Sequence, residues 1–404
     1  MKKTIVVVLF LYFVQGLIHN LGHPVTPTFV EYRNIPDYMF GLFFAAMSLG
    51  LTIGGPIWGI LGDRGNKRIY MSLGLGIYSI GQFGFAFFDD VYIMILFRFI
   101  SGFGVSASVT LLVAHVIEHS SKERRGRNLG WTAAAFTLGA SIGYLVGGIV
   151  SENQFFINIL ATDDLRNVFY FQAILNIVHA IVMFFLIKDV VRPVQEEKTT
   201  IIDGFKNIRK LNPTLIVFLI SLTFINIGTI NISKFMDVYF RDLGYSITQL
   251  GTFVMITGFV SLFTSIVIVP LILLIKHQMN MMIIIQFISA IIIAIVFRSK
   301  EVLLILYTVF MIYVVIKAIY IVLEQNYIAG HGKSGKYGEI MGVRQAFLAI
   351  GMVIGPIIGG FLYDLKPIYV FDFSVIMFTL GFVLLLIVRK RIIKELNSIV
   401  KDII

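Results

Sequence analysis

The chain of 404 residues contains no cysteine and few charged side chains. Without cysteine there can be no disulfide bond, no cysteine-ligated zinc and no thiol nucleophile. Charged residues make up 14% of the chain, against about 25% in an average soluble protein. Hydrophobic residues make up 57%, and a soluble chain would have to expose too many of them to water. The composition therefore excludes a soluble enzyme and a disordered or fibrous protein, and it predicts a polytopic membrane protein.

Long apolar segments give the expected architecture. A helix needs about 20 residues to cross a bilayer, and these segments are too long for the alternating strands of a barrel. The first segment begins with a basic N-terminus, but no small-residue cleavage site follows, so we interpret it as a retained helix. We predict an all-α membrane protein with twelve transmembrane helices, at residues 4–30, 38–61, 68–88, 91–117, 128–150, 167–188, 213–240, 247–274, 278–297, 301–325, 342–364 and 367–388.

Basic residues are concentrated in alternate connections between these segments. Of the 33 Lys and Arg residues, 24 fall on the side that includes both termini, 6 fall on the other side, and Arg98, Lys234 and Lys317 lie within helices. Basic connections stay in the cytoplasm, so we predict a cell-membrane protein with both termini cytoplasmic. The net charge of +10 then serves orientation, and we expect no nucleic-acid partner.

The two halves of the chain repeat one another. The longest polar connection, 189–212, separates a predicted six-helix bundle at 1–188 from a second one at 213–404. Six glycines recur at a constant offset of 212 residues, which indicates duplication: Gly126, Gly130, Gly139, Gly143, Gly147 and Gly148 match Gly338, Gly342, Gly351, Gly355, Gly359 and Gly360. Two such halves with a site between them near the middle of the membrane are typical of transporters.

Three motifs support this interpretation. A Gly-x-x-Gly-Asp-Arg-Gly loop begins at Gly59, and the fourth segment carries Arg98-Phe-Ile-Ser-Gly-Phe-Gly. The fifth segment carries Gly139-x3-Gly143-Tyr144-x2-Gly147-Gly148. These motifs resemble the signature loop, the fourth-helix arginine motif and the antiporter motif of the major facilitator superfamily. Tyr144 replaces the usual proline, whereas the eleventh segment has Pro356 at the equivalent place.

The resemblance implies two pseudosymmetric bundles and places the chain near the drug:proton antiporters. Glycines spaced by four lie on one helix face and let helices pack closely, and plain packing is the alternative to a role in switching. The residues that the resemblance assigns to the conformational switch are Gly59, Asp63, Arg64, Gly139, Gly143, Gly147, Gly351, Gly355, Pro356 and Gly359.

Polar side chains inside the predicted helices are candidates for substrate binding or proton coupling. Each is costly in lipid unless it faces a partner or water, and interhelical hydrogen bonding without a ligand is the alternative. Lys317 and Glu324 are about 10 Å apart along a helix, so we expect each to have another partner. The candidates are Gln15, His19, His23, Arg98, Gln172, Asn176, His179, Asn226, Asn231, Tyr313, Lys317, Tyr320 and Glu324.

The leading functional hypothesis is proton-coupled efflux of small amphiphilic compounds by alternating access. Histidine titrates at about pH 6.5, and Glu324 is the acidic candidate for coupling. Many exporters of the family carry an acid deep in the first or seventh helix. Its absence here favours neutral, zwitterionic or anionic substrates. Uptake of an organic anion, movement of a lipid-like molecule, and a non-transporting sensor or scaffold stay open as alternatives.

No catalytic constellation is present, so we expect a transporter and not an enzyme. The expected partners are a small-molecule substrate, protons and the lipid bilayer, with a monomeric chain and a proton gradient in place of a cofactor. His115-x-x-Glu118-His119 matches a zinc-peptidase pattern. No third-ligand motif follows it, and we therefore predict no metal site.

Overall fold

The computed structural model describes residues 3–63, 65–121, 124–160, 164–187, 211–275, 277–330 and 337–403. Regular structure in these ranges is entirely helical. Arg64 and nearly all of the predicted connection 189–212 lie outside the described residues. The helices of the first half are α1 (Lys3–Asn20), α2 (Thr26–Tyr32), α3 (Tyr38–Asp63), α4 (Lys67–Phe87), α5 (Val91–His119), α6 (Arg125–Glu152), α7 (Gln154–Leu160) and α8 (Arg166–Leu186).

The second half contains longer helices with two irregular breaks. Its elements are α10 (Pro213–Asp242), α11 (Ile247–Phe263), the π-helical turn η1 (Thr264–Ile268), α12 (Val269–Ile272), α13 (Gln278–Val296), α14 (Val302–Tyr307), α15 (Val309–Ala329), α16 (Tyr337–Leu365) and α17 (Pro367–Ile403). Every predicted segment thus contains a helix. Within the described residues, ten helical stretches are long and apolar enough to cross a membrane, and α1 contributes a shorter apolar helix.

The first predicted segment, 4–30, is not one helix. The helix α1 ends at Asn20, and α2 starts at Thr26. Pro24 lies in the gap and has no N–H to continue a helical ladder. The backbone N–H and the hydroxyl of Thr26 both donate to the carbonyl of Gly22, at 3.1 and 2.7 Å. The break leaves the last carbonyls of α1 without intrahelical donors, and other side chains bind them, as shown below.

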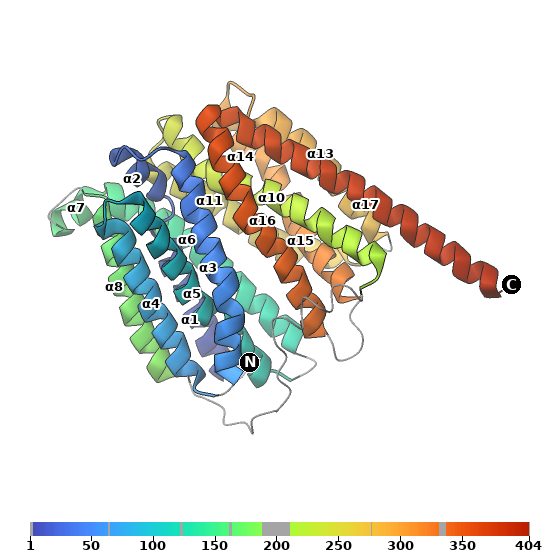
Figure 1. Cartoon of the computed structure of the whole chain (residues 1–404), viewed down its shortest axis with the longest axis horizontal. Helices are drawn as coiled ribbons and strands as arrows, with labels where there is room; N and C mark the ends of the chain where they lie inside the picture. The colour runs from blue at the N-terminus through green and yellow to red at the C-terminus, as the bar shows by residue number, and fades with distance from the viewer. Residues whose placement is uncertain are drawn as a thin grey trace. The chain divides into compact units, whose positions relative to one another are not determined.

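Local signals in the sequence explain the helix boundaries. The Asp90 carboxylate caps α5, because it accepts the backbone N–H groups of Tyr92 and Ile93 at 2.9 and 3.0 Å. The turn between α3 and α4 uses Gly65 and Asn66, both with positive φ, which these residue types tolerate. The helix α17 continues far beyond the predicted end at 388 and carries the C-terminus (Figure 1).

The chain divides into two compact units. The first comprises Met1–Glu196 with Met236–Leu262, and the second comprises Glu197–Phe235 with Phe263–Ile404. The last turns of α10 and the helix α11 therefore pack with the first unit. The division into bundles at 1–188 and 213–404 stays a prediction.

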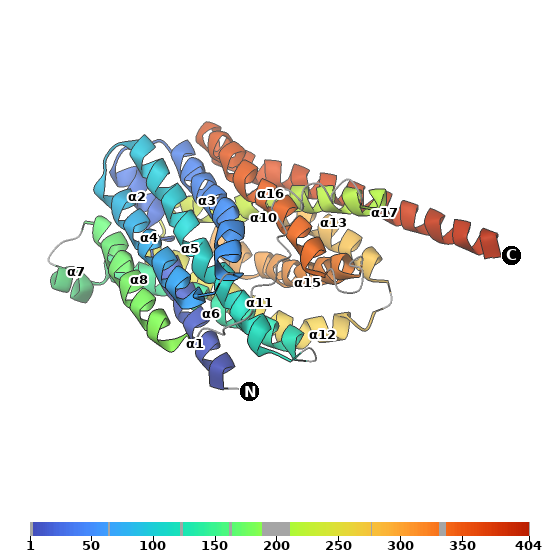
Figure 2. The ribbon, with the colours of Figure 1, turned by 60° about the horizontal axis from the view of Figure 1, so that its bottom comes forward.

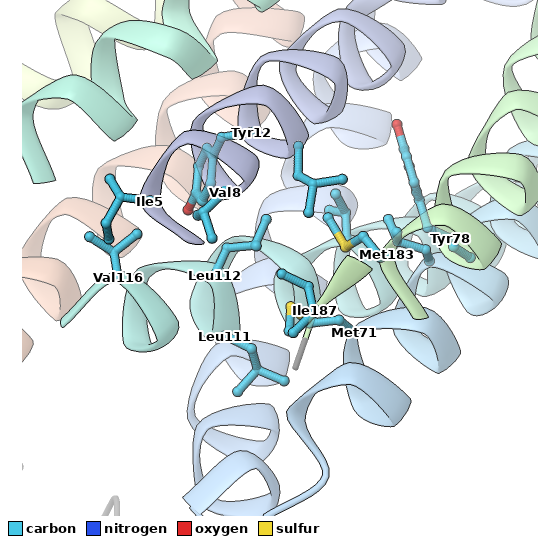
Figure 3. Packing of buried hydrophobic residues seen from close by; sticks show 14 of the residues in the cluster. Ile5, Val8, Tyr12, Met71, Tyr78, Leu111, Leu112, Val116, Met183 and Ile187 are labelled. Carbon is cyan, nitrogen blue, oxygen red and sulfur yellow. The ribbon is translucent and has the colours of Figure 1, made fainter. Parts of the chain in front are cut away.

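The first unit is built around α5. The helices α3 and α4 pack on it, α8 packs on α4, and α6 packs on α1 (Figure 2). One buried cluster joins Val8 and Tyr12 of α1 to Leu112 of α5, and to Met71 of α4 and Met183 of α8 (Figure 3). Aliphatic and aromatic side chains bury large apolar areas here, so the cluster holds α1, α4, α5 and α8 of the first unit together.

Candidate functional site

A cavity of about 170 Å³ lies inside the second unit. Five helices line it: α10, α13, α15, α16 and α17. The lining residues are Leu222, Ile225, Asn226, Thr229, Gln286, Ser289, Tyr313, Lys317, Tyr320, Ile321, Glu324, Arg344, Leu348 and Phe378. The cavity therefore brings together the sequence candidates Asn226, Tyr313, Lys317, Tyr320 and Glu324.

A buried ion pair forms part of the wall of this cavity. The guanidinium of Arg344 on α16 donates from Nε to both carboxylate oxygens of Glu324 on α15, at 3.0 and 2.9 Å, and its Nη2 also donates to Oε1. Glu324 is 1% exposed. Forked Arg–carboxylate contacts of this kind are strong and directional. Glu324 thus has the partner on another helix that the sequence required.

Lys317 lies on the same helix and gives the cavity its charge. Among the described residues, no carboxylate forms an ion pair with Lys317, and Glu324 is the one acid in the lining. With Glu324 neutralised by Arg344, the cavity carries a net positive charge. The electrostatic attraction of such a charge is stronger in a low-dielectric environment, so the cavity can attract an anionic group.

Neutral polar groups complete the lining. The amide of Asn226 donates to the backbone carbonyl of Leu348 at 2.7 Å, which fixes α10 against α16. The Tyr320 hydroxyl and the Gln286 Oε1 atom are buried, with no hydrogen-bond partner in the described part of the chain. A buried polar group without a hydrogen-bond partner is costly, so a ligand that forms a hydrogen bond with it binds more favourably. Aromatic and aliphatic neighbours surround these groups, as is usual in small-molecule pockets.

The first unit holds a separate polar network around the end of α1. The amide of Gln172 on α8 donates to the carbonyls of Ile18 and His19 at 2.6 and 3.0 Å. The hydroxyl of Tyr78 on α4 donates to the carbonyl of His19 at 3.3 Å and accepts the amide of Gln82 at 2.8 Å. These hydrogen bonds satisfy the carbonyls of Ile18 and His19 at the end of α1, which lack intrahelical donors because the helix breaks there. For Gln172, interhelical hydrogen bonding is therefore the observed arrangement.

Arg98 is a deeply buried cation in this network, 3% exposed. Its guanidinium carbon lies 3.5 Å from the centre of the Phe85 ring, a cation–π arrangement. Its Nη atoms donate to Gln82 and to Thr26 at 3.5 and 3.3 Å. Among the described residues, no carboxylate forms an ion pair with Arg98. A buried charge without a counter-ion is costly and is most often functional in a membrane helix.

His19 and His23 lie together beside the helix break. Their rings are 5.4 Å apart. The ring of His23 also stacks on Phe44 and on Tyr144, at 5.2 and 5.9 Å. The Tyr144 hydroxyl donates to Oδ2 of Asp237 at 3.1 Å, and Asp237 is 1% exposed.

The other polar candidates are buried but lie outside the cavity described above. The Gln15 amide, the Asn231 amide, the Asn176 Oδ1 atom and the His179 Nε2 atom have no hydrogen-bond partner in the ranges that the structure describes. The Asn176 amide nitrogen donates to the carbonyl of Gln172, one turn earlier in α8. These groups stay predictions as contacts to substrate or proton.

The glycine row of α6 brings two helix backbones into contact. A Cβ atom at Gly139, Gly143 or Gly147 would collide with the backbone carbonyl of Phe13, Leu17 or Leu21. These carbonyls are spaced by four along α1 and the residue that follows its end, like the glycines on α6. Only glycine permits this approach, so the row fixes how α6 packs on α1. Gly130 of the same repeat has no atom within 4 Å of its Cβ position.

The glycine row of α16 faces α10, where it meets mainly side chains and not the backbone. A Cβ atom at Gly351 would meet the amide of Asn226, one at Gly355 would lie 3.6 Å from Oδ1 of Asn231, and one at Gly359 would meet Asn231 and Phe235. Pro356 is buried inside α16, which continues through it. In the loop motif, Gly59 has ordinary contact distance to Thr110, and Asp63 is exposed.

An ion cluster holds the end of α10 within the first unit. Arg241 donates to the Asp37 carboxylate at 2.9 Å and to the carbonyl of Pro27 at 3.2 Å, and it pairs with Asp242 and Glu31 at 2.6 and 3.5 Å. The Glu152 carboxylate accepts the first backbone N–H groups of α11, from Ile247 at 2.7 Å and Thr248 at 2.9 Å. Together these contacts tie the α10–α11 corner to α2, α6 and the loop before α3.

Sequence reasoning missed three functional candidates in this arrangement. Arg344 is one of the 24 basic residues on the predicted cytoplasmic side, so its position in the chain indicates orientation and gives no sign that it pairs with Glu324. Asp237 lies three residues from Lys234 on the same helix, a spacing that favours pairing between those two and gives no sign of Tyr144. Gln286 lies in a strongly apolar segment with few other polar residues. Their proximity to the sites arises from helix packing, which no spacing along one helix can reveal.

Membrane-spanning helices, close glycine contacts between them and a charged internal cavity define a polytopic carrier. The model of the Major Facilitator Superfamily matches residues 8–334 and 242–401, so the chain belongs to this family. It is therefore an all-α, multi-pass membrane transporter, and not an enzyme; members of this family typically have twelve transmembrane helices. Transporters of this kind use an ion gradient and need no cofactor.

Relatives with known names support the same class. Multidrug resistance protein 1 of Bacillus subtilis is 26% identical over 397 residues, which cover 95% of this chain and 96% of that protein. The quinolone resistance protein NorA of Staphylococcus aureus is 26% identical over 398 residues, with 91% and 93% coverage. The crystal structure of a bacterial homologue of the human lysosomal transporter Spinster, inward-facing and occupied, matches with a TM-score of 0.79 at 13% identity and 96% coverage of both chains. The human organic anion transporter MFSD10 matches with a TM-score of 0.64 at 17% identity, covering 95% and 99%. At these identities the solved structures show the fold alone.

Proposed function

We propose that this chain exports small amphiphilic compounds from the cell in exchange for protons, by alternating access. The names of its relatives among drug-resistance proteins support efflux. We further propose that the chain works as a monomer with both termini in the cytoplasm.

The observation that carries the proposal is the Glu324–Arg344 pair on the wall of the cavity. Protonation of a paired carboxylate removes its charge and frees the guanidinium, so one proton changes the charge that a bound substrate meets. Because substrate and proton then compete for the same charged groups, the pair links the two binding events. Linkage of this kind is reciprocal, and it is what an exchanger needs.

The charge of the cavity favours substrates with an anionic or electron-rich group. Lys317 lies in the lining without an ion-pair partner among the described carboxylates, and it offers a direct contact for such a group. Aromatic neighbours such as Tyr313 and Phe378 offer an apolar surface for the rest of the molecule. A transporter of organic anions is the second candidate function, and the same lysine supports it.

The ties of Arg241 support the alternating-access part of the proposal. This residue contacts acids on either side of the α2–α3 loop from the end of α10. A substrate path that opens at this end of the helices must break these contacts. Several weak ion pairs at a partly exposed site can be exchanged at low cost, and that suits a gate.

Reconstituted proteoliposomes test the function directly. The chain is incorporated with an imposed pH gradient, and the movement of a cationic, a neutral and an anionic dye is followed by fluorescence. We expect dye movement against its gradient when protons flow the opposite way, and none when the gradient is collapsed. Transport that ignores the pH gradient would refute proton exchange. If only the anionic dye is transported, and it moves in the same direction as the protons, the result would support the organic-anion function instead.

A further inference from the structure

We infer that His115, Glu118 and His119, near the end of α5, form a binding site for a divalent transition metal ion of the zinc type. Within the described residues, this is the one set of three or more His, Cys, Asp or Glu side chains close enough to hold an ion. One nitrogen from each imidazole and one carboxylate oxygen all lie within 4.8 Å of one another. Ligand atoms on a tetrahedral zinc are about 3 to 4 Å apart, so small side-chain rotations complete the set.

The tautomer of His119 is set in the way a metal ligand requires. Its Nδ1 atom lies 2.9 Å from the carbonyl oxygen of His115. A carbonyl only accepts hydrogen bonds, so Nδ1 must carry the proton, and Nε2 of the neutral ring keeps its lone pair. Metal-binding histidines are held in this manner, with one ring nitrogen bonded to a carbonyl and the other on the metal. The two rings lie 4.0 Å apart between centres, one helical turn from each other.

The carboxylate of Glu118 has one oxygen occupied and one available. Its Oε1 atom pairs with the ammonium of Lys67 at 2.8 Å, and both side chains are largely buried. Its Oε2 atom is also buried and has no hydrogen-bond partner in the described part of the chain. A buried carboxylate oxygen without a donor is costly. A metal ion that takes this oxygen together with the two imidazoles removes the cost, and water fills the remaining positions.

The nature of the ligands indicates the class of ion. Two imidazoles and one carboxylate favour zinc, copper, nickel or cobalt over magnesium or calcium, which prefer oxygen ligands throughout. The site has no place in proton exchange and lies outside the cavity of the second unit. Lys67 at the start of α4 connects the site to a neighbouring helix. A bound metal ion and the Lys67 ammonium group would compete for the negative charge of the same Glu118 carboxylate.

Metal binding by the full-length protein tests the inference. The chain is purified in detergent with a tag that contains no histidine, and zinc chloride is titrated in by calorimetry. We expect one zinc ion per chain. In the His115→Gln/His119→Gln variant, we expect binding to weaken by at least about tenfold. Substituting cobalt should give the intense visible absorption of a tetrahedral site, and this absorption should be lost in the same variant.

Two further sets of variants separate a metal site from a structural cluster. His19→Gln/His23→Gln removes the other histidine pair spaced by four, and His277→Gln removes an exposed histidine; both should bind zinc like the unmodified chain. Lys67→Met removes the competing cation and should tighten binding by several-fold, which a purely structural role does not predict. If the His115→Gln/His119→Gln variant fails to fold, the single substitution Glu118→Gln tests the loss of one ligand instead. Absence of stoichiometric binding, or unchanged affinity in both the Glu118 and the Lys67 variants, would overturn the inference.

Discussion

The hydroxyl of Tyr144 on α6 donates a hydrogen bond to the buried carboxylate of Asp237 on α10, at 3.1 Å. Tyr144 stands where the repeated glycine row has Pro356. The residue that departs from the family motif is thus the residue that holds a buried acid, and its ring also stacks on His23.

Replacing Tyr144 with phenylalanine should destabilise the protein while the ring packing is kept. The change removes one hydrogen bond to a buried carboxylate, which is worth about 1.5 to 3 kcal/mol. We expect a lower midpoint of thermal unfolding in detergent. Tyr239→Phe alters a less buried hydroxyl on the same α10 end and serves as the control. Equal midpoints for Tyr144→Phe and the unmodified chain would show that the bond contributes nothing.

The Glu324–Arg344 pair should behave as a unit. Glu324→Gln or Arg344→Gln leaves one buried charge without its partner, which costs about 3 to 5 kcal/mol. The double variant removes both charges and should recover much of that loss. The free energies of unfolding of the unmodified chain, the two single variants and the double variant together give the coupling energy between Glu324 and Arg344.

The Arg298–Asp372 pair of the same unit is the matched control. Its side chains are 53% and 34% exposed, and a pair at that exposure contributes about 0 to 1 kcal/mol. A coupling energy for Glu324–Arg344 that is no larger than for Arg298–Asp372 would contradict the buried-pair interpretation. Loss of proton dependence in Glu324→Gln, with substrate binding kept, would support its role in coupling.

Lys317 should decide between anionic and neutral substrates. Lys317→Met keeps the length of the side chain and removes its charge. We expect binding of anionic compounds to weaken by at least about tenfold, equivalent to about 1.4 kcal/mol, and binding of neutral compounds to change little. Ligand-induced thermal stabilisation across a charged and neutral series measures this. Lys317→Arg keeps the charge and should keep anion binding. An equal loss for neutral and anionic compounds would instead indicate a packing role.

The glycine row of α6 should tolerate no side chain. Gly143→Ala places a Cβ atom against the backbone of Leu17, so the two helices must move apart, at a cost of about 1 to 3 kcal/mol. Gly130→Ala on the same helix meets no atom and should be neutral or slightly stabilising, because alanine favours the helix. Unfolding midpoints of the two variants test the contrast. A Gly143→Ala protein as stable as Gly130→Ala would disprove the close contact.

The Arg241 cluster should control opening at its end of the helices. Arg241→Gln removes the ties to Asp37 and Glu31 and should make that end easier to open. The chain has no cysteine, so a cysteine introduced at Phe44, which is 7% exposed, reports the change through its rate of thiol labelling. We expect faster labelling in Arg241→Gln than in the parent. The double variant Asp37→Arg/Arg241→Asp exchanges the two charges and should restore slow labelling. Equal labelling rates in the parent, in Arg241→Gln and in this double variant would exclude a gate.

Much of the fold follows from the sequence alone. Apolar segments of bilayer length, the order of helices and the repeated glycines were all predicted, because each depends on residues close together in the chain. Burial of Gln172, Asn176 and His179 also follows, since residues three and four apart share a helix face. The break after Asn20 was missed, because the apolar pattern of 4–30 continues through it and outweighed the signal of Gly22 and Pro24.

Only the tertiary structure decided which polar groups meet. Glu324 was expected to have a partner on another helix, but Arg344 became that partner through the packing of α16 on α15. His115, Glu118 and His119 form a pattern in the sequence, and the proximity of their ligand atoms together with the hydrogen bond of the His119 ring supports the metal site that we infer. A hydrogen bond or ion pair between helices depends on rotations and offsets of about 1 Å, which the spacing of residues along each helix does not specify. The sequence determined that this is a membrane transporter with few internal charges, and packing determined where those charges act.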